Sequence, residues 1–297
     1  MGLRSFTILT AACALTPIPA DLQAEPDFFI RVKESGGSLS GVPLERYVES
    51  VVASETYADW PRAALRAQSV VARTYALYER ERNAKRPFDV ESTVLSQRYG
   101  VEPVADSVRR STRATQGEYL AHDNRPILAV FHAAGGGRTA TSEEVWGRSL
   151  PYLRSVESPD SEAPDFFWSY SIPTADFFQA LRASGVGTPD GPVEVTRRSA
   201  SGRVVILRVG ESVLSGRDVR DLLGGRALRS TMFDVRIEGD TLRFLGSGSG
   251  HGVGLSQWGA RELARRGWDY RQILAYYYPG TSLRKLGETD TGRRAAR

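Results

Sequence analysis

The stretch GHGVGLSQWGA, residues 250–260, places an imidazole, an amide and an indole on a backbone in which every second residue is at first glycine. Glycine adopts positive φ angles and has no Cβ, so such a segment bends sharply and lies close to a neighbouring strand or a ligand. The G-x-G-x-x-G spacing of a dinucleotide loop is absent. A nucleophile elbow is excluded too, because Trp258 stands where G-x-S-x-G needs its second glycine. We expect this stretch to form one wall of a cleft.

An apolar stripe of helical period predicts a helix that begins after Pro43 and ends in a carboxylic acid, Glu55. The other members of the stripe are Leu44, Tyr47, Val48, Val51 and Val52. Burial disfavours the charged form of a carboxyl group, which raises its pKa and makes it a candidate general acid for cleaving a glycosidic bond. The alternative is that Glu55 only closes the helix, exposed or paired with Arg62 or Arg66.

A second helix is predicted over residues 62–82, with Asp59 as its cap and Pro61 in its first turn. We expect polar side chains of this helix and of two glycine-rich bends to converge on one site. The expected members are Gln68, Arg73, His132, His251, Ser256 and Gln257. A lone histidine is as often structural as functional. For Trp258, stacking on a sugar ring and packing in the core both stay open. Tyr276, Tyr277 and Tyr278 are expected in the core.

The remaining pattern predicts an α+β fold. We expect the N-terminal helix pair to pack on a mixed or antiparallel sheet, with a β-rich insertion at about 172–245 and helices at the C-terminal end. Residues 1–24 resemble an export signal, since Arg4 precedes a short apolar run and small residues suited to cleavage. Residues 25–286 form the expected domain, and residues 287–297 an expected disordered basic tail.

The charge and cysteine content exclude several classes of protein. The 39 Lys+Arg and 35 Asp+Glu give a net charge of +4, far from the dense basic face of a nucleic-acid binder. Such an excess suits an exported protein beside an anionic polymer, or is a solubilising surface charge. Cys13 is the only cysteine and lies in the predicted signal, so the mature chain would have no disulfide and no thiolate site. With three histidines and no H-E-x-x-H, we expect no metal and no cofactor.

Several ordered motifs resemble the SpoIID/LytB family, over roughly residues 27–286. They are residues 44–48 through Glu55, residues 64–77, 131–139 and 142–146, residues 151–153 and 228–233, the stretch 250–260 and residues 277–281. Long motifs in the family's order are far more specific than any one of them.

The resemblance implies a lytic transglycosylase that cuts peptidoglycan strands already stripped of their stem peptides. Its catalytic acid/base carries over to Glu55, and the C6 hydroxyl of N-acetylmuramic acid would attack C1 to close a 1,6-anhydro ring. A hydrolase would want a second carboxylate, and the nearest, Asp59, is expected to be a cap. Stripped strands expose lactyl carboxylates, for which Arg73 and Arg138 are the candidate guanidinium ligands.

Two further implications follow from the resemblance. Some members bind zinc through cysteine and histidine in the first glycine-rich bend, where this chain has Gly135 and Arg138, so we expect no zinc. Some members stimulate a separate amidase, so a wall-binding amidase enhancer without catalysis stays open, as does a plain muramidase. In each case we expect an exported protein in the periplasm or cell-wall space, without a stable membrane span after signal cleavage.

Overall fold

The computed structural model describes residues 28–34, 36–91, 103–164, 166–187 and 190–287. The export signal predicted for residues 1–24 lies outside these ranges, and so does the predicted tail beyond residue 287. Within the described ranges, no helix combines the length and apolar character that a membrane span needs.

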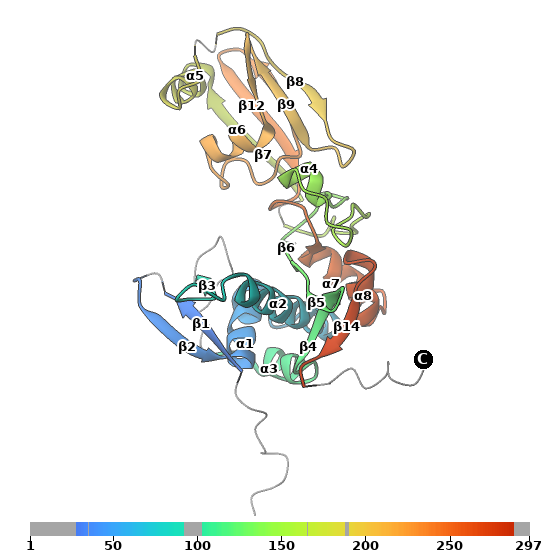
Figure 1. Ribbon diagram of the computed structural model, residues 1–297. Helices are drawn as coiled ribbons and strands as arrows, with labels where there is room; N and C mark the ends of the chain where they lie inside the picture. Colours follow the sequence, from blue (N-terminus) through green and yellow to red (C-terminus); the bar gives the residue numbers. More distant parts are fainter. Residues whose placement is uncertain (1–27, 35, 92–102, 165, 188–189, 288–297) are drawn as a thin grey trace, which may run out of the picture.

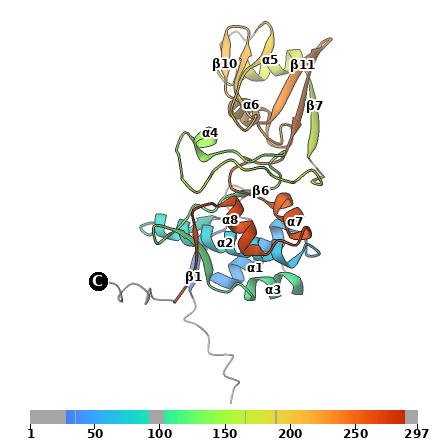
Figure 2. The ribbon, with the colours of Figure 1, turned by 90° about the vertical axis from the view of Figure 1, so that its right-hand side faces the viewer.

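Two lobes stand one above the other in Figures 1 and 2, joined by irregular segments around α4 (Ser142–Trp146). The lower lobe is mainly helical. Its helices are α1 (Leu44–Glu55), α2 (Arg62–Arg82), α3 (Asp106–Arg113), α7 (Gln257–Arg265) and α8 (Tyr270–Tyr277). The upper lobe is the β-rich part. The α+β class predicted from the sequence is confirmed.

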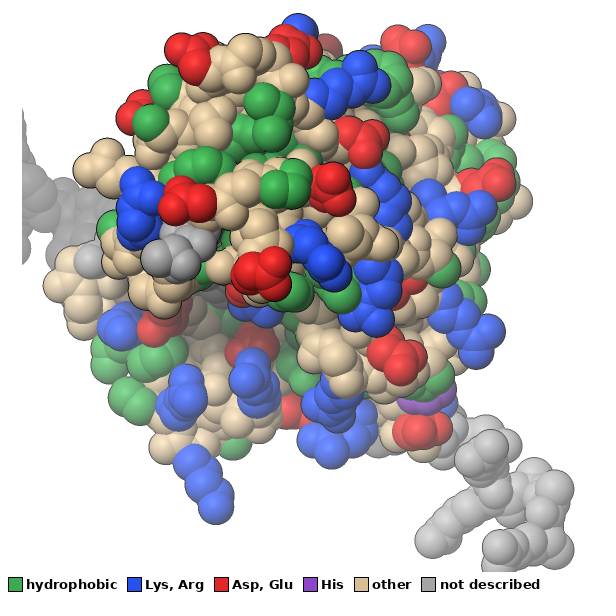
Figure 3. Space-filling model, turned by 90° about the horizontal axis from the view of Figure 1, so that it is seen from above, with side chains coloured by type: hydrophobic (Ala, Val, Ile, Leu, Met, Phe, Trp, Pro, Cys, Tyr) green, Lys and Arg blue, Asp and Glu red, His purple; other side chains and the backbone are tan. Residues whose placement is uncertain are grey.

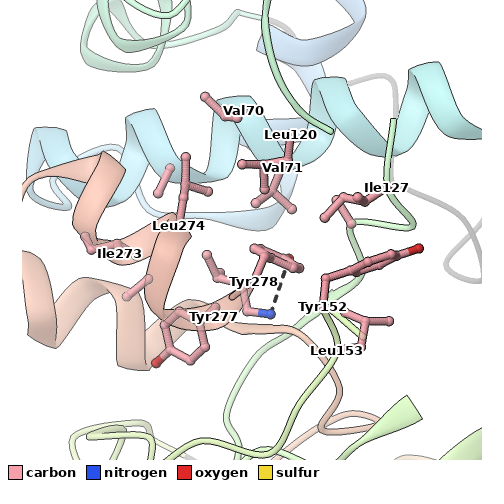
Figure 4. Packing of buried hydrophobic residues seen from close by; sticks show 14 of the residues in the cluster. Val70, Val71, Leu120, Ile127, Tyr152, Leu153, Ile273, Leu274, Tyr277 and Tyr278 are labelled. Atoms are coloured by element: carbon pink, nitrogen blue, oxygen red, sulfur yellow. Dashed lines mark hydrogen bonds between the residues drawn. The ribbon is translucent and has the colours of Figure 1, made fainter. Parts of the chain in front are cut away.

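The long helix α2 runs through the centre of the lower lobe and is buried on more than one face. Val70 and Val71 face a core that includes Ile273 and Tyr277 of α8 and Leu120; Figure 4 shows these side chains between the helices. On its other side α2 packs on a second core, which α1 and the first two strands share. Helix α2 therefore has two buried faces, because two cores meet on it.

Small sheets replace the single sheet that we expected beneath the helix pair. One mixed sheet has the order β2 (Leu39–Pro43), β1 (Phe29–Lys33), β3 (Val90–Glu91). An antiparallel sheet has the order β14 (Ser282–Lys285), β4 (Glu118–His122), β5 (Arg125–Pro126). Between residues 127 and 132 only the short strand β6 (Phe131–His132) forms, and it pairs in parallel with β13 (Leu255–Ser256).

The upper lobe contains two three-stranded antiparallel sheets and two helices. One sheet has the order β11 (Phe233–Glu238), β12 (Thr241–Ser247), β7 (Phe167–Pro173), and the other β10 (Ser212–Leu214), β9 (Val204–Val209), β8 (Val193–Arg198). The helices are α5 (Thr174–Ala183) and α6 (Gly216–Leu223). Phe177, Leu207, Val219 and Phe244 are fully buried together, so this lobe has a core of its own.

The chain enters and leaves the upper lobe through the two glycine-rich bends. Ala134 bridges Ser249, and Ala140 bridges Val253, so the bends lie side by side. Gly254 has a φ of +74°, and a Cβ there would lie 2.1 Å from the carbonyl oxygen of Val130. The glycine spacing of residues 250–254 thus serves a close approach of two backbones.

Candidate active site

Glu55 is the last residue of α1, and its side chain is half-buried. The helix ends at Thr56, whose backbone N–H and hydroxyl both donate to the carbonyl oxygen of Val52, at 3.0 and 2.7 Å. The amide Nε2 of Gln257 donates to the backbone oxygen of Glu55 at 3.0 Å. This bond satisfies a carbonyl that a helix end leaves open. Since Gln257 is the buried first residue of α7, the end of α1 is fixed to the start of α7.

Three aromatic rings lie beside this point. The ring of Trp258 lies 5.3 Å from that of Trp60 and 6.2 Å from that of Tyr57, centroid to centroid, with edge-on geometry. The guanidinium of Arg261 lies 4.9 Å from the centre of the Trp258 ring. Trp60 is buried, whereas Tyr57, two residues after Glu55, is 60% exposed. The group therefore offers a flat apolar surface next to the end of α1, of the kind on which sugar rings stack.

The two histidines of the glycine-rich bends lie together, with ring centroids 5.5 Å apart. His132 Nδ1 is 3.1 Å from the backbone oxygen of Val253, and a carbonyl only accepts, so Nδ1 carries the proton. His251 Nδ1 accepts from the backbone N–H of Val253 at 3.0 Å, so its proton is on Nε2. The buried Nε2 of His132 has no partner within the described part of the chain. Trp146 covers His251, with centroids 5.5 Å apart.

Both imidazoles are held neutral at pH 7. Burial lowers the pKa of His251 to about 4, and the positive charge of Arg203 acts in the same direction. Burial also lowers the pKa of His132 well below its ordinary value, with His251 and Arg203 adding to the effect. Each ring therefore contributes a neutral hydrogen-bonding edge, and neither contributes a cation.

Two consecutive residues, Ser256 and Gln257, connect the histidine-bearing bend to the end of α1. In the parallel pair of β6 and β13, Ser256 lies opposite His132, and the next residue, Gln257, bonds the backbone of Glu55. His132 and His251 thus lie together, and Gln257 attaches the end of α1 to the segment that follows them. That these side chains form one substrate site with Glu55 stays a prediction.

A buried carboxylate, Asp160, joins the first glycine-rich bend to the start of α7 beneath this site. We call this hydrogen-bonded group the junction. Its Oδ2 accepts from the hydroxyls of Ser158 and Ser256, each at 2.8 Å, and from the backbone N–H of Gly135. Its Oδ1 accepts from the N–H of Gly137 at 2.9 Å. Ser256 also caps α7 by accepting from a backbone N–H, so its hydroxyl is fully used and buried. Its position is structural, in contrast to the substrate contact that we expected.

Arg203 reaches this junction from the upper lobe. Its Nη2 donates to the carbonyl oxygens of Gly135 and Arg138, at 3.1 and 3.4 Å. The side chain is 3% exposed, and burial lowers the pKa of Arg203 to about 10. A Cβ on Gly252 would lie 1.9 Å from the same nitrogen, so the guanidinium packs directly on the glycine bend.

The resemblance implied zinc in some relatives at the positions of Gly135 and Arg138. Here the Arg203 cation contacts the carbonyls of both residues. The described part of the chain has no group of three metal-ligating side chains. That the protein binds no zinc stays a prediction.

Arg73 does not lie where a substrate carboxylate could reach it. Its side chain is fully buried and pairs with Glu45 of α1 through two bonds, Nε to Oε1 at 2.7 Å and Nη2 to Oε2 at 2.6 Å. Nη1 donates to the backbone oxygen of Glu118 at 3.0 Å. The guanidinium thus has a structural position, and we do not carry Arg73 forward as a glycan ligand. An interior residue of a helix with two buried faces has no access to solvent, which the sequence pattern did not show.

Gln68 and Asp59 also differ from their expected places, whereas Arg138 stays exposed. Gln68 is 2% exposed, with no partner for its Nε2 within the described residues. Arg138 is 45% exposed and pairs with Glu157 at 3.4 Å, so it stays available to a ligand. Asp59 does not cap α2: Pro61 holds the N-cap position, without any side-chain cap.

Sequence reasoning missed three contributors to this region: Asp160, Arg203 and Tyr57. Asp160 lies in an irregular segment, and Arg203 lies directly before β9. Both contact Gly135 only because the lobes meet there. Tyr57 follows Glu55 by two residues, and that proximity was the one available signal.

Comparison with known proteins agrees with this architecture. A family model described as stage II sporulation protein matches residues 34–122, and one described as a domain of unknown function (DUF8618) matches residues 153–254. An uncharacterized protein of Brachyspira hyodysenteriae is 34% identical over 243 residues, which are 81% of this chain and 66%, just under two thirds, of that protein.

Two named relatives match as well. Stage II sporulation protein D of Bacillus amyloliquefaciens is 33% identical over 268 residues, covering 84% of this chain and 77% of that protein. The amidase enhancer of Bacillus subtilis is 26% identical over 289 residues, covering 80% of this chain and 40% of that protein.

Proposed function

The chain belongs to the SpoIID/LytB family, and from that premise we propose that it is an exported lytic transglycosylase that cuts stem-peptide-free peptidoglycan strands. Glu55 is its general acid and base. The observation that carries the proposal is the bond from Gln257 to the backbone of Glu55, because it holds the acid-bearing end of α1 against the segment that contains Trp258 and follows His251.

The position of Glu55 suits proton donation. The residue ends a helix of 12 residues that has no basic side chain in its last turn. The C-terminal end of a helix carries partial negative charge and disfavours a carboxylate there. The half-buried side chain also loses part of its hydration.

The proposed reaction needs only this one carboxyl group. Glu55 gives its proton to the glycosidic oxygen as the bond from that oxygen to C1 of N-acetylmuramic acid breaks. The C6 hydroxyl oxygen of the same sugar bonds to C1, and its proton passes to the Glu55 carboxylate. The products are a free 4-hydroxyl and a 1,6-anhydro ring, and the acid is regenerated.

Glu55→Gln tests the proposal, with Asp59→Asn as its matched control four residues along the chain. Asp59 is exposed and caps nothing, so it is the nearest candidate for a second carboxylate. On stripped glycan we expect anhydro-muramic ends from the parent and from Asp59→Asn, and a rate at least about 100-fold lower from Glu55→Gln. Reducing ends that depend on both carboxylates would indicate a muramidase instead.

A second candidate function is the non-catalytic enhancement of a cell-wall amidase, supported by the relative that carries the name amidase enhancer. It predicts no glycan cleavage by the parent and an increase in amidase activity that survives Glu55→Gln.

Arg138→Gln tests the remaining guanidinium candidate for binding the lactyl carboxylate. An unchanged preference for stripped over peptide-bearing strands would remove Arg138 from the site.

A further inference from the structure

A pocket of about 480 Å³ lies between the start of α2 and α3, and arginines dominate its lining. Arg62 and Arg66 come from α2, and Arg110 and Arg113 from α3. The hydroxyl-bearing Ser107 and Ser111 complete its polar lining. Figure 1 shows α3 beneath α2, on the side of the lower lobe that faces away from the β-rich lobe.

Few acidic groups act on these four arginines: in the described part of the chain, the charge of Arg110 acts on Asp106 and that of Arg113 on Glu49, in both cases without an ion pair. Within residues 28–34, 36–91, 103–164, 166–187 and 190–287, none of them forms an ion pair, and the buried Nε of Arg66 has no hydrogen-bond partner. Their neighbour Arg109, which does not line the pocket, pairs with Asp106 at 2.9 Å. The pocket therefore gathers four positive charges that are only partly compensated.

The helix terminus adds to this charge. Helix α2 has 21 residues, no side-chain cap and no acidic residue in its first turn. The positive end of its dipole therefore points towards Arg62, where a cation is unfavourable unless an anion is bound. The nearby acid Glu49 is partly buried, which raises its pKa, while the charges of Arg113 and Arg109 lower it.

The face opposite this pocket differs in character. Figure 3 views the molecule from the side of the β-rich lobe, and acidic and basic side chains are interspersed across that face. The clustering at α2 and α3 is thus not a property of the surface in general.

We propose that this pocket binds the carboxylate groups of the glycan strand at a distance from the cleaved bond, so that the strand is held at a second point. The inference rests on the proposed function for the identity of the strand. A guanidinium binds a carboxylate through two parallel hydrogen bonds, and the volume suits a sugar-sized group better than a single small ion.

The chain connects the two points directly. Six residues, 56–61, separate Glu55 from Arg62, and Tyr57 and Trp60 lie on this loop. The hydroxyl of Ser107 donates to the backbone oxygen of Ala58 at 2.7 Å, so α3 is attached to the same loop. A strand that leaves the carboxyl group of Glu55 over the exposed Tyr57 would continue towards the arginines.

The test measures binding without cleavage, in full-length Glu55→Gln protein, with soluble stripped glycan oligomers as the probe. Arg110→Gln/Arg113→Gln removes two exposed liners of the pocket, and Arg109→Gln is the matched control on the same helix. We expect the double variant to weaken binding about five- to thirtyfold and the control less than about twofold. Circular dichroism checks that each variant is folded.

Two further probes identify the anion. Oligomers whose carboxylates have been converted to neutral amides should bind the parent and the double variant equally. A soluble glycerol-phosphate polymer should compete only weakly. If Arg109→Gln weakens glycan binding as much as the double variant, or if the double variant does not weaken it, the proposal that the pocket binds the strand is overturned. Strong competition by the phosphate polymer, together with tight binding of amidated glycan, would overturn the carboxylate assignment.

The same measurements separate this inference from the proposed function. If the parent produces no anhydro ends but binding still depends on Arg110 and Arg113, catalysis fails and the second binding point stands. If cleavage depends on Glu55 and binding ignores both arginines, the pocket fails and catalysis stands.

Discussion

Arg73→Met should destabilise the fold, mainly through the loss of its ion pair with Glu45. The guanidinium is 0% exposed, whereas 29% of the Glu45 side chain is exposed. Breaking a buried pair costs about 3–5 kcal/mol, because one charge is left without compensation. After Arg73→Met, Glu45 regains water and keeps the N–H of Gly117 at 3.2 Å, which places this variant near the lower limit. Glu45→Gln strands a fully buried cation and should lie near the upper limit.

The double variant Glu45→Gln/Arg73→Met leaves neither charge, so it should cost at least about 2 kcal/mol less than the sum of the single variants. Urea unfolding at constant m value measures all three free energies. The control is Arg125→Met, which removes an exposed pair with Glu81 and should cost about 1 kcal/mol or less. If Arg73→Met costs no more than Arg125→Met, or if the single costs simply add, the buried pair does not have the structural role described above.

Three further outcomes follow from burial and close packing. The unfolded chain protonates His251 near pH 6.5 and the folded chain near pH 4, so stability should fall as the pH drops from 6.5 to 4, by up to about 3 kcal/mol from this residue; in pH-dependent urea unfolding, an equal slope for His251→Asn would contradict this. Gly246→Ala places a Cβ 2.1 Å from the ring of Trp168 and should cost about 1–3 kcal/mol in thermal unfolding, while Gly41→Ala, whose nearest contact would be 3.8 Å, should be close to neutral; similar losses at both positions would refute the packing argument. Asp160→Asn turns an amide group towards donors and should cost about 2–4 kcal/mol, with faster hydrogen exchange at residues 133–137; unchanged exchange there would mean that the carboxylate does not hold the junction.

Periodic patterns anticipated the local structure well. The stripe that ends in Glu55 predicted α1 to its last residue, and the second helix has the predicted bounds, 62–82. These predictions succeed because a helix shows its period in the sequence, and a cap or a proline marks its end. The same local rules failed at Asp59, where Pro61 took the cap position and left the start of α2 open to an anion.

Contacts between distant segments were the part that no pattern revealed. Nothing local distinguishes Arg73, which pairs with Glu45 28 residues away, from an arginine that reaches solvent. Arg203 likewise stands at the start of a predicted strand with nothing to mark it, yet its guanidinium contacts Gly135, 68 residues upstream.

The sequence by itself indicated the two N-terminal helices and the glycine bends, because these depend on neighbours within a few residues. Only the tertiary structure decided which polar groups are buried where the lobes meet and which stay exposed. That choice depends on burial, and burial is set by segments far apart in the chain packing against each other.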